Sequence, residues 1–297
     1  MKTRAKIILF SVLSITIILS GCTTTLPDDS DDDNIPDGLY VSLSGDREFT
    51  SIQEAIDQAL ENETVYVFSG TYNETININK TINLMGENPD NTIIDGSKIE
   101  DVITIDSAKF CSVTGFTIQN SGSSSSGIEI RTTNNIISDT IVRNCYNGIH
   151  CNRANDNLIF NNTLLLNNNY GVYVYNSNYV IARNNTFVQN EYGMRIKGSR
   201  HNEVISNQFK DNYQGMYFCC GATTNFAYYN TFVNNTIWNA NDYVGGNIWY
   251  NEETSKGNYW DDYNGIDEDD DCVGDTPYDI TSDGSKQDKY PLMEPWS

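Results

Sequence analysis

Residues 158–180 read LIFNNTLLLNNNYGVYVYNSNYV, and residues 181–202 read IARNNTFVQNEYGMRIKGSRHN. Both segments contain an N-N-T triplet, a further Asn five residues after its second Asn, and a Y-G pair followed by alternating apolar residues. The same marks extend over residues 139–235 in steps of 22 or 23 residues. A fixed period of this size indicates stacked repeats, each burying its apolar side against its neighbours. The two columns are Asp139, Asn162, Asn185, Asn207 and Asn230, and Asn144, Asn167, Asn190, Asn212 and Asn235.

Within each repeat the apolar residues alternate, which is the spacing of β-strands and not of helices. The clearest alternation follows a recurring glycine, and about three short strands fit into one repeat. Leucine-rich repeats are not supported, because neither their L-x-x-L-x-L pattern nor a helical spacing occurs, and a hexapeptide repeat would be far shorter. The pattern predicts a single-stranded, right-handed parallel β-helix. The glycines are Gly127, Gly148, Gly171, Gly193 and Gly215.

The asparagine columns predict the corners of this coil. Asn tolerates the left-handed conformation and bonds to its own backbone, so it suits tight turns. Amide side chains stacked over one another can also bond along the coil, as in the Asn ladders of cross-β structures. A third corner column is Asn135, Asn157, Asn178, Asn202 and Asn225.

Both ends of the coil need a cover, because an open terminal rung exposes apolar side chains and unpaired backbone groups. Residues 51–60 begin with the capping box S-I-Q-E and place their apolar residues on one helical face, which predicts a capping helix. Residues 236–297 are rich in Trp and Tyr, and such large side chains are suited to cover the last rung. We expect one domain, residues 39–297.

The N-terminus is typical of a secreted lipoprotein. Three basic residues precede an apolar run over residues 7–19, which is short for a membrane span, and the sequence L-S-G-C ends at Cys22. This predicts a signal peptide over residues 1–21 and a lipidated Cys22 that attaches the chain to the membrane outside the cytoplasm. Residues 22–38 are acidic and lack periodicity, which predicts a flexible tether.

The composition excludes one large class of partners. The net charge is −22, with 40 acidic against 18 basic residues. Nucleic acid binding needs a basic surface, so we expect no nucleic acid partner. Six cysteines besides Cys22 would permit disulfides outside the cell, but the sequence does not decide among the 15 pairings. They are Cys111, Cys145, Cys151, Cys219, Cys220 and Cys272.

The repeats, together with the C-terminal segments G-N-Y-W-D-D-Y (257–263), G-D-T-P-Y (274–278) and Y-P-L-M (290–293), resemble the NosD-like right-handed β-helix proteins. The resemblance extends over about residues 38–297 and implies the pectin-lyase-like fold and an extracytoplasmic location. It implies little about activity, because this fold carries lyases, hydrolases, epimerases and plain binding modules.

A loop near the C-terminus carries alternating carboxylates. Hard cations such as Ca²⁺ take several converging oxygen ligands, and alternation within a tight turn provides them. The resembling proteins have Gly where this chain has Cys272, and no Glu completes an EF-hand. We expect a structural Ca²⁺ site, with a solvated acidic loop as the alternative. Its ligands are Asp267, Asp269, Asp271 and Asp275.

Side chains that alternate with the core residues should form a stripe along the outside of the coil. The stripe after the glycines is Glu129, His150, Tyr173, Arg195 and Tyr217, and a turn stripe beside it is Tyr146, Tyr170, Tyr192 and Tyr213. Sugar rings stack on aromatic faces, so an extended polysaccharide along the coil would meet a ring on successive turns. We therefore expect a non-catalytic surface scaffold or binding module for extracellular polysaccharide or surface-layer components.

Two alternatives stay open. A polysaccharide lyase or glycoside hydrolase would use Glu129, His150 and Arg195, although paired acids and the G-H-G and D-P-H-E motifs of related enzymes are missing. The resemblance also implies assistance in maturing a copper site. Copper favours soft ligands, but Cys151, Met194 and Met216 fall in core columns, where such side chains are ordinary packing. The candidate soft ligands are His150, Cys151, Met194, Met216, Cys219 and Cys220.

Overall fold

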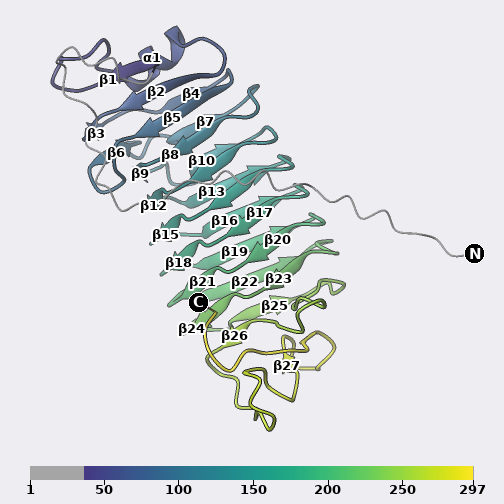
Figure 1. The fold of residues 1–297 in the computed structure, drawn as a ribbon. Coiled ribbons are helices and arrows are strands. Elements are labelled where there is room, and N and C mark those ends of the chain that lie inside the picture. Colours follow the sequence, from purple (N-terminus) through teal and green to yellow (C-terminus); the bar gives the residue numbers. More distant parts are fainter. Residues whose placement is uncertain (1–36, 297) are drawn as a thin grey trace, which may run out of the picture.

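The computed structural model describes residues 37–296, and these form a coil of stacked turns with three parallel sheets as its walls (Figure 1). The first sheet contains β1 (Leu39–Val41), β2 (Glu63–Val67), β5 (Ile82–Gly86), β8 (Ser112–Thr114), β11 (Ile136–Ser138), β14 (Leu158–Phe160), β17 (Ile181–Arg183), β20 (Glu203–Ile205) and β23 (Phe226–Tyr228). The second contains β4 (Ile76–Ile78), β7 (Ile103–Ile105), β10 (Ser126–Ile130), β13 (Asn147–Asn152), β16 (Tyr170–Tyr175), β19 (Tyr192–Lys197), β22 (Gln214–Cys219) and β25 (Ala240–Asp242). The third contains β3 (Gly70–Tyr72), β6 (Thr92–Asp95), β9 (Thr117–Gln119), β12 (Ile141–Arg143), β15 (Thr163–Leu165), β18 (Thr186–Val188), β21 (Gln208–Lys210), β24 (Thr231–Val233) and β26 (Tyr259–Trp260).

The chain therefore adopts the predicted right-handed parallel β-helix. Each turn adds one strand to each sheet, and every strand pair within the three sheets is parallel, with neighbouring strands about 4.8 Å apart. A small antiparallel pair, β27 (Tyr278–Asp279) and β28 (Gln287–Asp288), lies in the C-terminal segment. The second sheet, which contains β10, β13, β16, β19 and β22, is the wall whose outer face carries the candidate site.

The core is built from like side chains stacked over one another. In the third sheet Phe187, Phe209, Phe232 and Trp260 lie ring on ring, with centroids 4.5–4.8 Å apart and planes within 7° of parallel. All four are buried. The ring of Tyr278, in the C-terminal segment, extends the stack, with its centroid 4.3 Å from that of Trp260. Aromatic pairs add about 0.5–1.5 kcal/mol beyond the area they bury, so this stack couples neighbouring turns.

The glycine column is explained by space between turns and not by unusual backbone angles. A Cβ on Gly148 would lie 2.4 Å from the carbonyl oxygen of Gly171, and one on Gly171 would lie 2.5 Å from that of Gly193. The same holds for Gly193 against Gly215, at 2.7 Å. Adjacent turns approach too closely here for any side chain.

Two corner columns form the predicted amide ladders. Asn185 Oδ1 accepts two hydrogen bonds from Asn162, one from its backbone N–H and one from its side-chain Nδ2, each at 3.0 Å. Asn207 and Asn230 each accept the same two bonds from the preceding Asn of the column. Asn167, Asn190, Asn212 and Asn235 form the second ladder in the same way.

The first member of each ladder and one member of the third column were predicted wrongly, whereas the pairs Asn135–Asn157 and Asn202–Asn225 of the third column bond to each other as in the ladders. Thr140 and Cys145, not Asp139 and Asn144, donate to the ladder, because Asp139 and Asn144 occupy left-handed corners with φ of 51° and 54°. In the third column Val180, not Asn178, lies between Asn157 and Asn202. Asn178 accepts the backbone N–H of Arg200 in the neighbouring turn.

Both ends of the coil are covered. The helix α1 (Ile52–Gln58) begins at the N-cap Ser51, two residues shorter than predicted at its C-terminal end, and packs on β1, β2 and β4 with Ile52, Ala55 and Ile56 buried. At the other end the first ladder continues through Asn258 to the buried Asp288, whose Oδ2 also accepts the indole N–H of Trp260 at 3.0 Å.

Several predictions concern residues outside the described range. The predicted signal peptide, the lipidated Cys22 and the tether up to residue 36 lie there. Within residues 37–296 no helix has the length and apolar character needed to cross a membrane. The six cysteines of that range are free thiols, and Cys151 lies in the core as predicted.

Candidate functional site on the outer face of the second sheet

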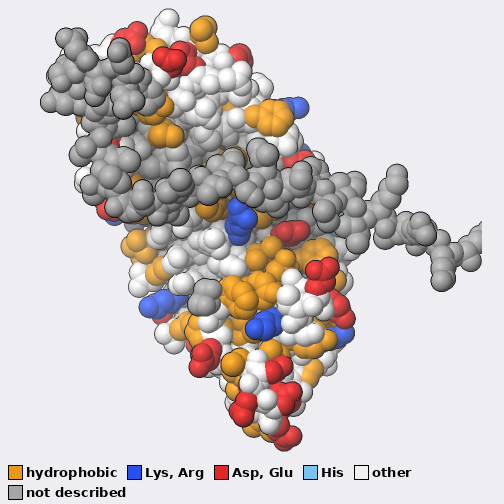
Figure 2. Space-filling view, in the orientation of Figure 1, with side chains coloured by type: hydrophobic (Ala, Val, Ile, Leu, Met, Phe, Trp, Pro, Cys, Tyr) orange, Lys and Arg blue, Asp and Glu red, His pale blue; other side chains and the backbone are white. Residues whose placement is uncertain are grey.

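The predicted outward stripe forms one continuous column. Register pairs each member with the next across neighbouring strands of the second sheet. In the view of Figure 2, side chains of the hydrophobic class, Tyr included, gather over the middle turns with Lys and Arg between them. We call this set the outward column: Glu129 on β10, His150 on β13, Tyr173 on β16, Arg195 on β19 and Tyr217 on β22.

A buried carboxylate begins the column. Glu129 is 4% exposed, and its Oε2 lies 2.8 Å from His150 Nδ1 and accepts a bond from Ser126 Oγ at 3.2 Å. Its Oε1 accepts a bond from Asn152 at 3.1 Å and lies 3.5 Å from Arg131 Nε. Burial works to raise the pKa of Glu129, but these partners, His150 foremost, outweigh it and lower the pKa below its usual range.

A second acid lies beside this group. Asp101 accepts the backbone N–H of Ser126 at 2.6 Å, and its Oδ2 lies 3.6 Å from Arg131 Nη2. Burial, with a smaller contribution from the nearby Glu129, raises the pKa of Asp101. A cavity of about 280 Å³ adjoins it, lined by Thr75, Ile76, Asn77, Glu100, Asp101, Thr104, Asp106 and Arg131.

His150 connects the acids to the aromatic part of the column. Its ring stacks on Tyr173 with centroids 4.8 Å apart and planes 11° from parallel. Nδ1 faces Glu129, while Nε2 is buried and has no hydrogen-bond partner among residues 37–296. A carboxylate on one imidazole nitrogen fixes the ring and its tautomer, so the arrangement resembles an oriented base whose working nitrogen is covered.

Arg195 is held among aromatic rings. Its guanidinium carbon lies 5.5 Å from the ring centroids of Tyr170 and Tyr217 and 5.8 Å from that of Tyr173. Nη1 donates to the Tyr170 hydroxyl, and Nε and Nη2 each lie 3.3 Å from Cys219 Sγ. Such cation–π contacts contribute about 0.5–2 kcal/mol each and fix the guanidinium in place. Burial raises the pKa of Tyr173 to about 12, so its hydroxyl stays neutral.

The predicted turn stripe divides into two positions. Tyr170 and Tyr192 are register partners and pack on the outward column, with Tyr192 also beside Tyr217 at 6.2 Å. Tyr146 and Tyr213 come one position earlier relative to the glycine, and Tyr213 lines a polar groove around the corner. Only half of the stripe therefore joins the column.

Three residues beside the column were not predicted as part of it. Trp238 lies edge-on to Tyr192 and Tyr217, at 6.1 and 6.0 Å. Tyr175 stacks beside Tyr173 at 5.8 Å, with Lys197 Nζ 5.4 Å from its ring. The signal was present, because Tyr175 and Lys197 come two positions after the column residues on the same strands and therefore face the same side.

The predicted catalytic trio does not converge. Glu129 and His150 are in contact, but Tyr173 separates His150 from Arg195, which places Arg195 two strand spacings, roughly 10 Å, along the coil.

The predicted soft ligands do not converge either. Cys151, Met194 and Met216 face the core, whereas His150 faces Glu129 and Cys219 faces Arg195. Cys220 is exposed, next to Cys219 in the chain. The side chains of Cys219 and Cys220 are in contact with each other, so the described part of the chain brings two of these six soft ligands together.

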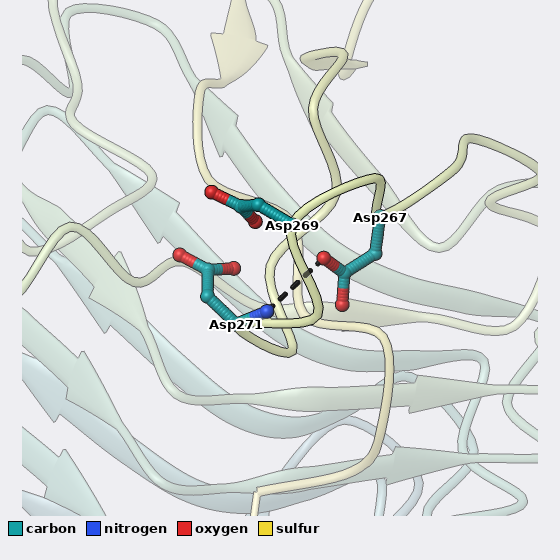
Figure 3. A group of neighbouring side chains, drawn as sticks. All are labelled: Asp267, Asp269 and Asp271. Atoms are coloured by element: carbon teal, nitrogen blue, oxygen red, sulfur yellow. Dashed lines mark hydrogen bonds between the residues drawn. The ribbon is translucent and has the colours of Figure 1, made fainter.

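The acidic loop brings three of its four predicted ligands together (Figure 3). Oxygens of Asp267, Asp269 and Asp271 lie within 4.8 Å of one another, and repulsion by Asp271 raises the pKa of Asp269. Asp267 also accepts the backbone N–H groups of Asp271 and Cys272, at 3.1 and 2.9 Å. Asp275 instead accepts the backbone N–H of Glu268 at 2.7 Å.

Comparison with solved structures shows similarity to other β-helix proteins. The chain is 20% identical to ORF18 of Geobacillus virus E2 over 70% of this chain and 52% of that one, with a TM-score of 0.48, so it spans about half of the viral protein. It is 11% identical to the pectin methylesterase from carrot, over 73% of this chain and 87% of that one, with a TM-score of 0.44. It is 15% identical to the mannuronan C-5 epimerase AlgE6 A-module of Azotobacter vinelandii, over 70% of this chain and 87% of that one, with a TM-score of 0.35. No curated protein matches the sequence.

A family model described as "Periplasmic copper-binding protein (NosD)" matches residues 56–265. The matched segment runs from within α1 to beyond β26 and includes the whole outward column. It comprises 210 of the 297 residues and confirms the resemblance seen in the repeats. The chain therefore belongs to the NosD family.

Proposed function

We propose that this protein binds an extended polysaccharide outside the cytoplasm, along the outer face of the second sheet. The observation that carries the proposal is the outward column, in which His150, Tyr173, Arg195 and Tyr217 occupy successive turns with Tyr170, Tyr192 and Trp238 beside them. An extended sugar chain parallel to the coil axis would meet one of these groups about every 4.8 Å. The family description as periplasmic supports the location.

The charges of this face favour an acidic or polar sugar chain. Arg195 and Lys197 lie among the rings, and the guanidinium is already oriented by Tyr170 and Cys219. An oriented cation loses little freedom when it binds a carboxylate, so it contributes to selectivity at low entropic cost. The chain as a whole carries a net charge of −22, so a polyanion would depend on the local positive charge of Arg195 and Lys197 to bind.

Binding is a better fit than catalysis. The trio of Glu129, His150 and Arg195 does not meet around one point, and the nitrogen that a base would use is covered. General base catalysis requires the base within hydrogen-bond reach of the proton that it removes.

The Glu129–His150 pair nevertheless favours one alternative, eliminative cleavage of a uronate polysaccharide. There His150 Nε2 would take the C5 proton, a C4–C5 double bond would form, and the C4–O bond would break as the leaving oxygen gains a proton from water. The ultraviolet absorbance of the new double bond would reveal this activity, and its loss in Glu129→Gln would establish it.

We further propose that lipidated Cys22 attaches the protein to the membrane, where surface-layer components are additional candidate partners. We also propose that Ca²⁺ bound by Asp267, Asp269 and Asp271 stabilises the C-terminal cap. The copper-site alternative has less support from the described residues, because Cys219 and Cys220 contact each other but His150, Cys151, Met194 and Met216 do not join them. Binding of the polysaccharide does not depend on either proposal.

A glycan array tests the proposed function. The full chain should bind one class of extended polysaccharide, and the double variant Tyr173→Ala plus Tyr217→Ala should bind at least about tenfold more weakly, because two stacking faces are lost. The control is Tyr243→Ala, since Tyr243 is 76% exposed and lies outside the column. Equal binding by the double variant and the control would refute the proposal.

A further inference from the structure

Another pocket lies on a different wall, the outer face of the first sheet near its C-terminal end. It is a cavity of about 350 Å³ between β20, β23 and the segment 248–253 that follows β25. Register places Glu203 beside Phe226, and Phe226 beside Ile248. The lining residues are Glu203, Phe226, Tyr228, Ile248, Tyr250, Asn251, Glu252 and Glu253.

The lining combines aromatic rings with negative charge. Phe226, Tyr228 and Tyr250 are each half-buried, and three carboxylates share the cavity, whereas none of its lining residues is basic. This composition differs from that of the outward column, where arginine and lysine lie among the rings. A hard metal ion would need several converging oxygens, and no such group of acids forms here among residues 37–296.

Glu203 is the distinctive member. Its carboxylate is half-buried, and no hydrogen bond or ion pair to it is found among residues 37–296. Burial alone raises its pKa. A carboxylate removed from water without a partner is costly, and a bound cation would offset that cost.

The rings are in the neutral state that attracts a cation. Burial, and next the nearby Glu203, raise the pKa of Tyr228 to about 12, so its ring keeps a neutral hydroxyl. At the rim, Lys289 Nζ already lies 5.1 Å from the ring centroid of Tyr250. Aromatic faces combined with a carboxylate are the surroundings in which proteins bind organic ammonium groups.

We propose that this pocket binds a small organic ammonium compound, with the cationic group against Phe226 and Tyr228 and its charge opposite Glu203. The cavity is within the size range of small-molecule sites. The site is separate from the proposed polysaccharide face, so either one can fail without the other.

Titration calorimetry of the full chain tests the proposal with choline and with 3,3-dimethylbutan-1-ol, which has the same shape without the charge. Choline and tetramethylammonium should bind saturably, and the neutral alcohol at least about tenfold more weakly, because the cation–π and carboxylate contacts require charge. Butylammonium, which mimics a lysine side chain, should also bind more weakly than tetramethylammonium, because a primary amine is more strongly hydrated.

Glu203→Gln should weaken choline binding at least about tenfold, whereas Glu191→Gln, an exposed acid on another corner, should leave it unchanged. A conservative Phe226→Leu variant should weaken it while retaining the melting temperature within a few degrees. The proposal is overturned if choline does not bind saturably, if the neutral alcohol binds as well, or if Glu203→Gln binds as tightly as the unchanged chain.

Discussion

Asn207→Ala is the sharpest test of the idea that stacked amides hold the coil together. Asn207 is buried, its Oδ1 accepts the backbone N–H of Asn185 at 2.9 Å, and its Nδ2 donates to the Ala182 carbonyl at 2.9 Å and to Asn230 Oδ1 at 3.0 Å. Alanine would leave the N–H of Asn185 buried without an acceptor, which costs about 1–3 kcal/mol, and lose further bonds worth about 1 kcal/mol each. The expected loss is about 3–5 kcal/mol.

Urea unfolding measures this loss. With a slope of roughly 2–3 kcal/mol per molar, the midpoint should fall by about 1–2.5 M. Asn168→Ala is the matched control, because Asn168 is exposed, belongs to the same repeat pattern and should change the free energy of unfolding by less than about 0.5 kcal/mol. Asn207→Asp keeps the acceptor but buries a charge facing carbonyl oxygens, so it should be destabilised at neutral pH and recover in acid. An Asn207→Ala midpoint equal to that of the control would refute the ladder argument.

Three further predictions concern other parts of the coil. Gly171→Ala should lower the free energy of unfolding by about 1–3 kcal/mol in urea, because its Cβ would lie 2.5 Å from the Gly193 carbonyl oxygen; an unchanged midpoint would mean that the turns can separate easily. Because burial raises the pKa of Glu203, its favourable contribution is present below the unfolded pKa and is lost as pH rises through the folded pKa. Urea unfolding should therefore show Glu203→Gln to be more stable than the unchanged chain at pH 7 and to lose that advantage at pH 4; the same difference in the free energy of unfolding at both pH values would contradict this. Millimolar Ca²⁺ should raise the melting temperature above its value in chelator, and Asp271→Asn should abolish this rise. Equal melting temperatures with and without chelator would refute the proposed Ca²⁺ site.

The fold was predictable because a solenoid repeats one local solution. Alternating apolar residues fix which side chains face inward, and a constant period fixes which of them stack, so no long-range information beyond the repeat is needed. The alternation likewise predicted the outward column from Glu129 to Tyr217, although not its neighbour Trp238, which lies beyond the regular repeats.

Two of the errors share one physical cause, a shift of a single position, whereas Asn178 precedes the true column member Val180 by two positions. Where two polar residues are adjacent at a corner, the first takes the left-handed conformation and the second enters the ladder, as Asn161 and Asn162 show. In the first rung the second residue is Thr140, so Asp139 was placed in the ladder when it is the corner. The tyrosine stripe failed in the same way at Tyr213, because one step along a strand reverses the side to which a side chain points.

The pocket at Glu203 could not be predicted from the repeat at all. Two of its walls come from regular strands, but Tyr250, Glu252 and Glu253 belong to the non-repeating segment that turns back over the first sheet. No period relates that segment to the strands it covers, so its position depends on the packing of the C-terminal cap. Trp249, buried beside Phe218 and Trp260, fixes where this segment leaves the core.

The stacking that stabilises the coil also determines how its outer face can recognise a ligand. Each member of the outward column is held by the turn before it and the turn after it, as His150 is by Glu129 and Tyr173, so little side-chain freedom remains to be lost on binding. A rigid surface with one contact group per turn gives each additional sugar unit a similar increment of free energy. Affinity should therefore rise with ligand length until the ligand reaches from His150 to Tyr217 and then level off, whereas a single deep subsite would saturate with the shortest ligand.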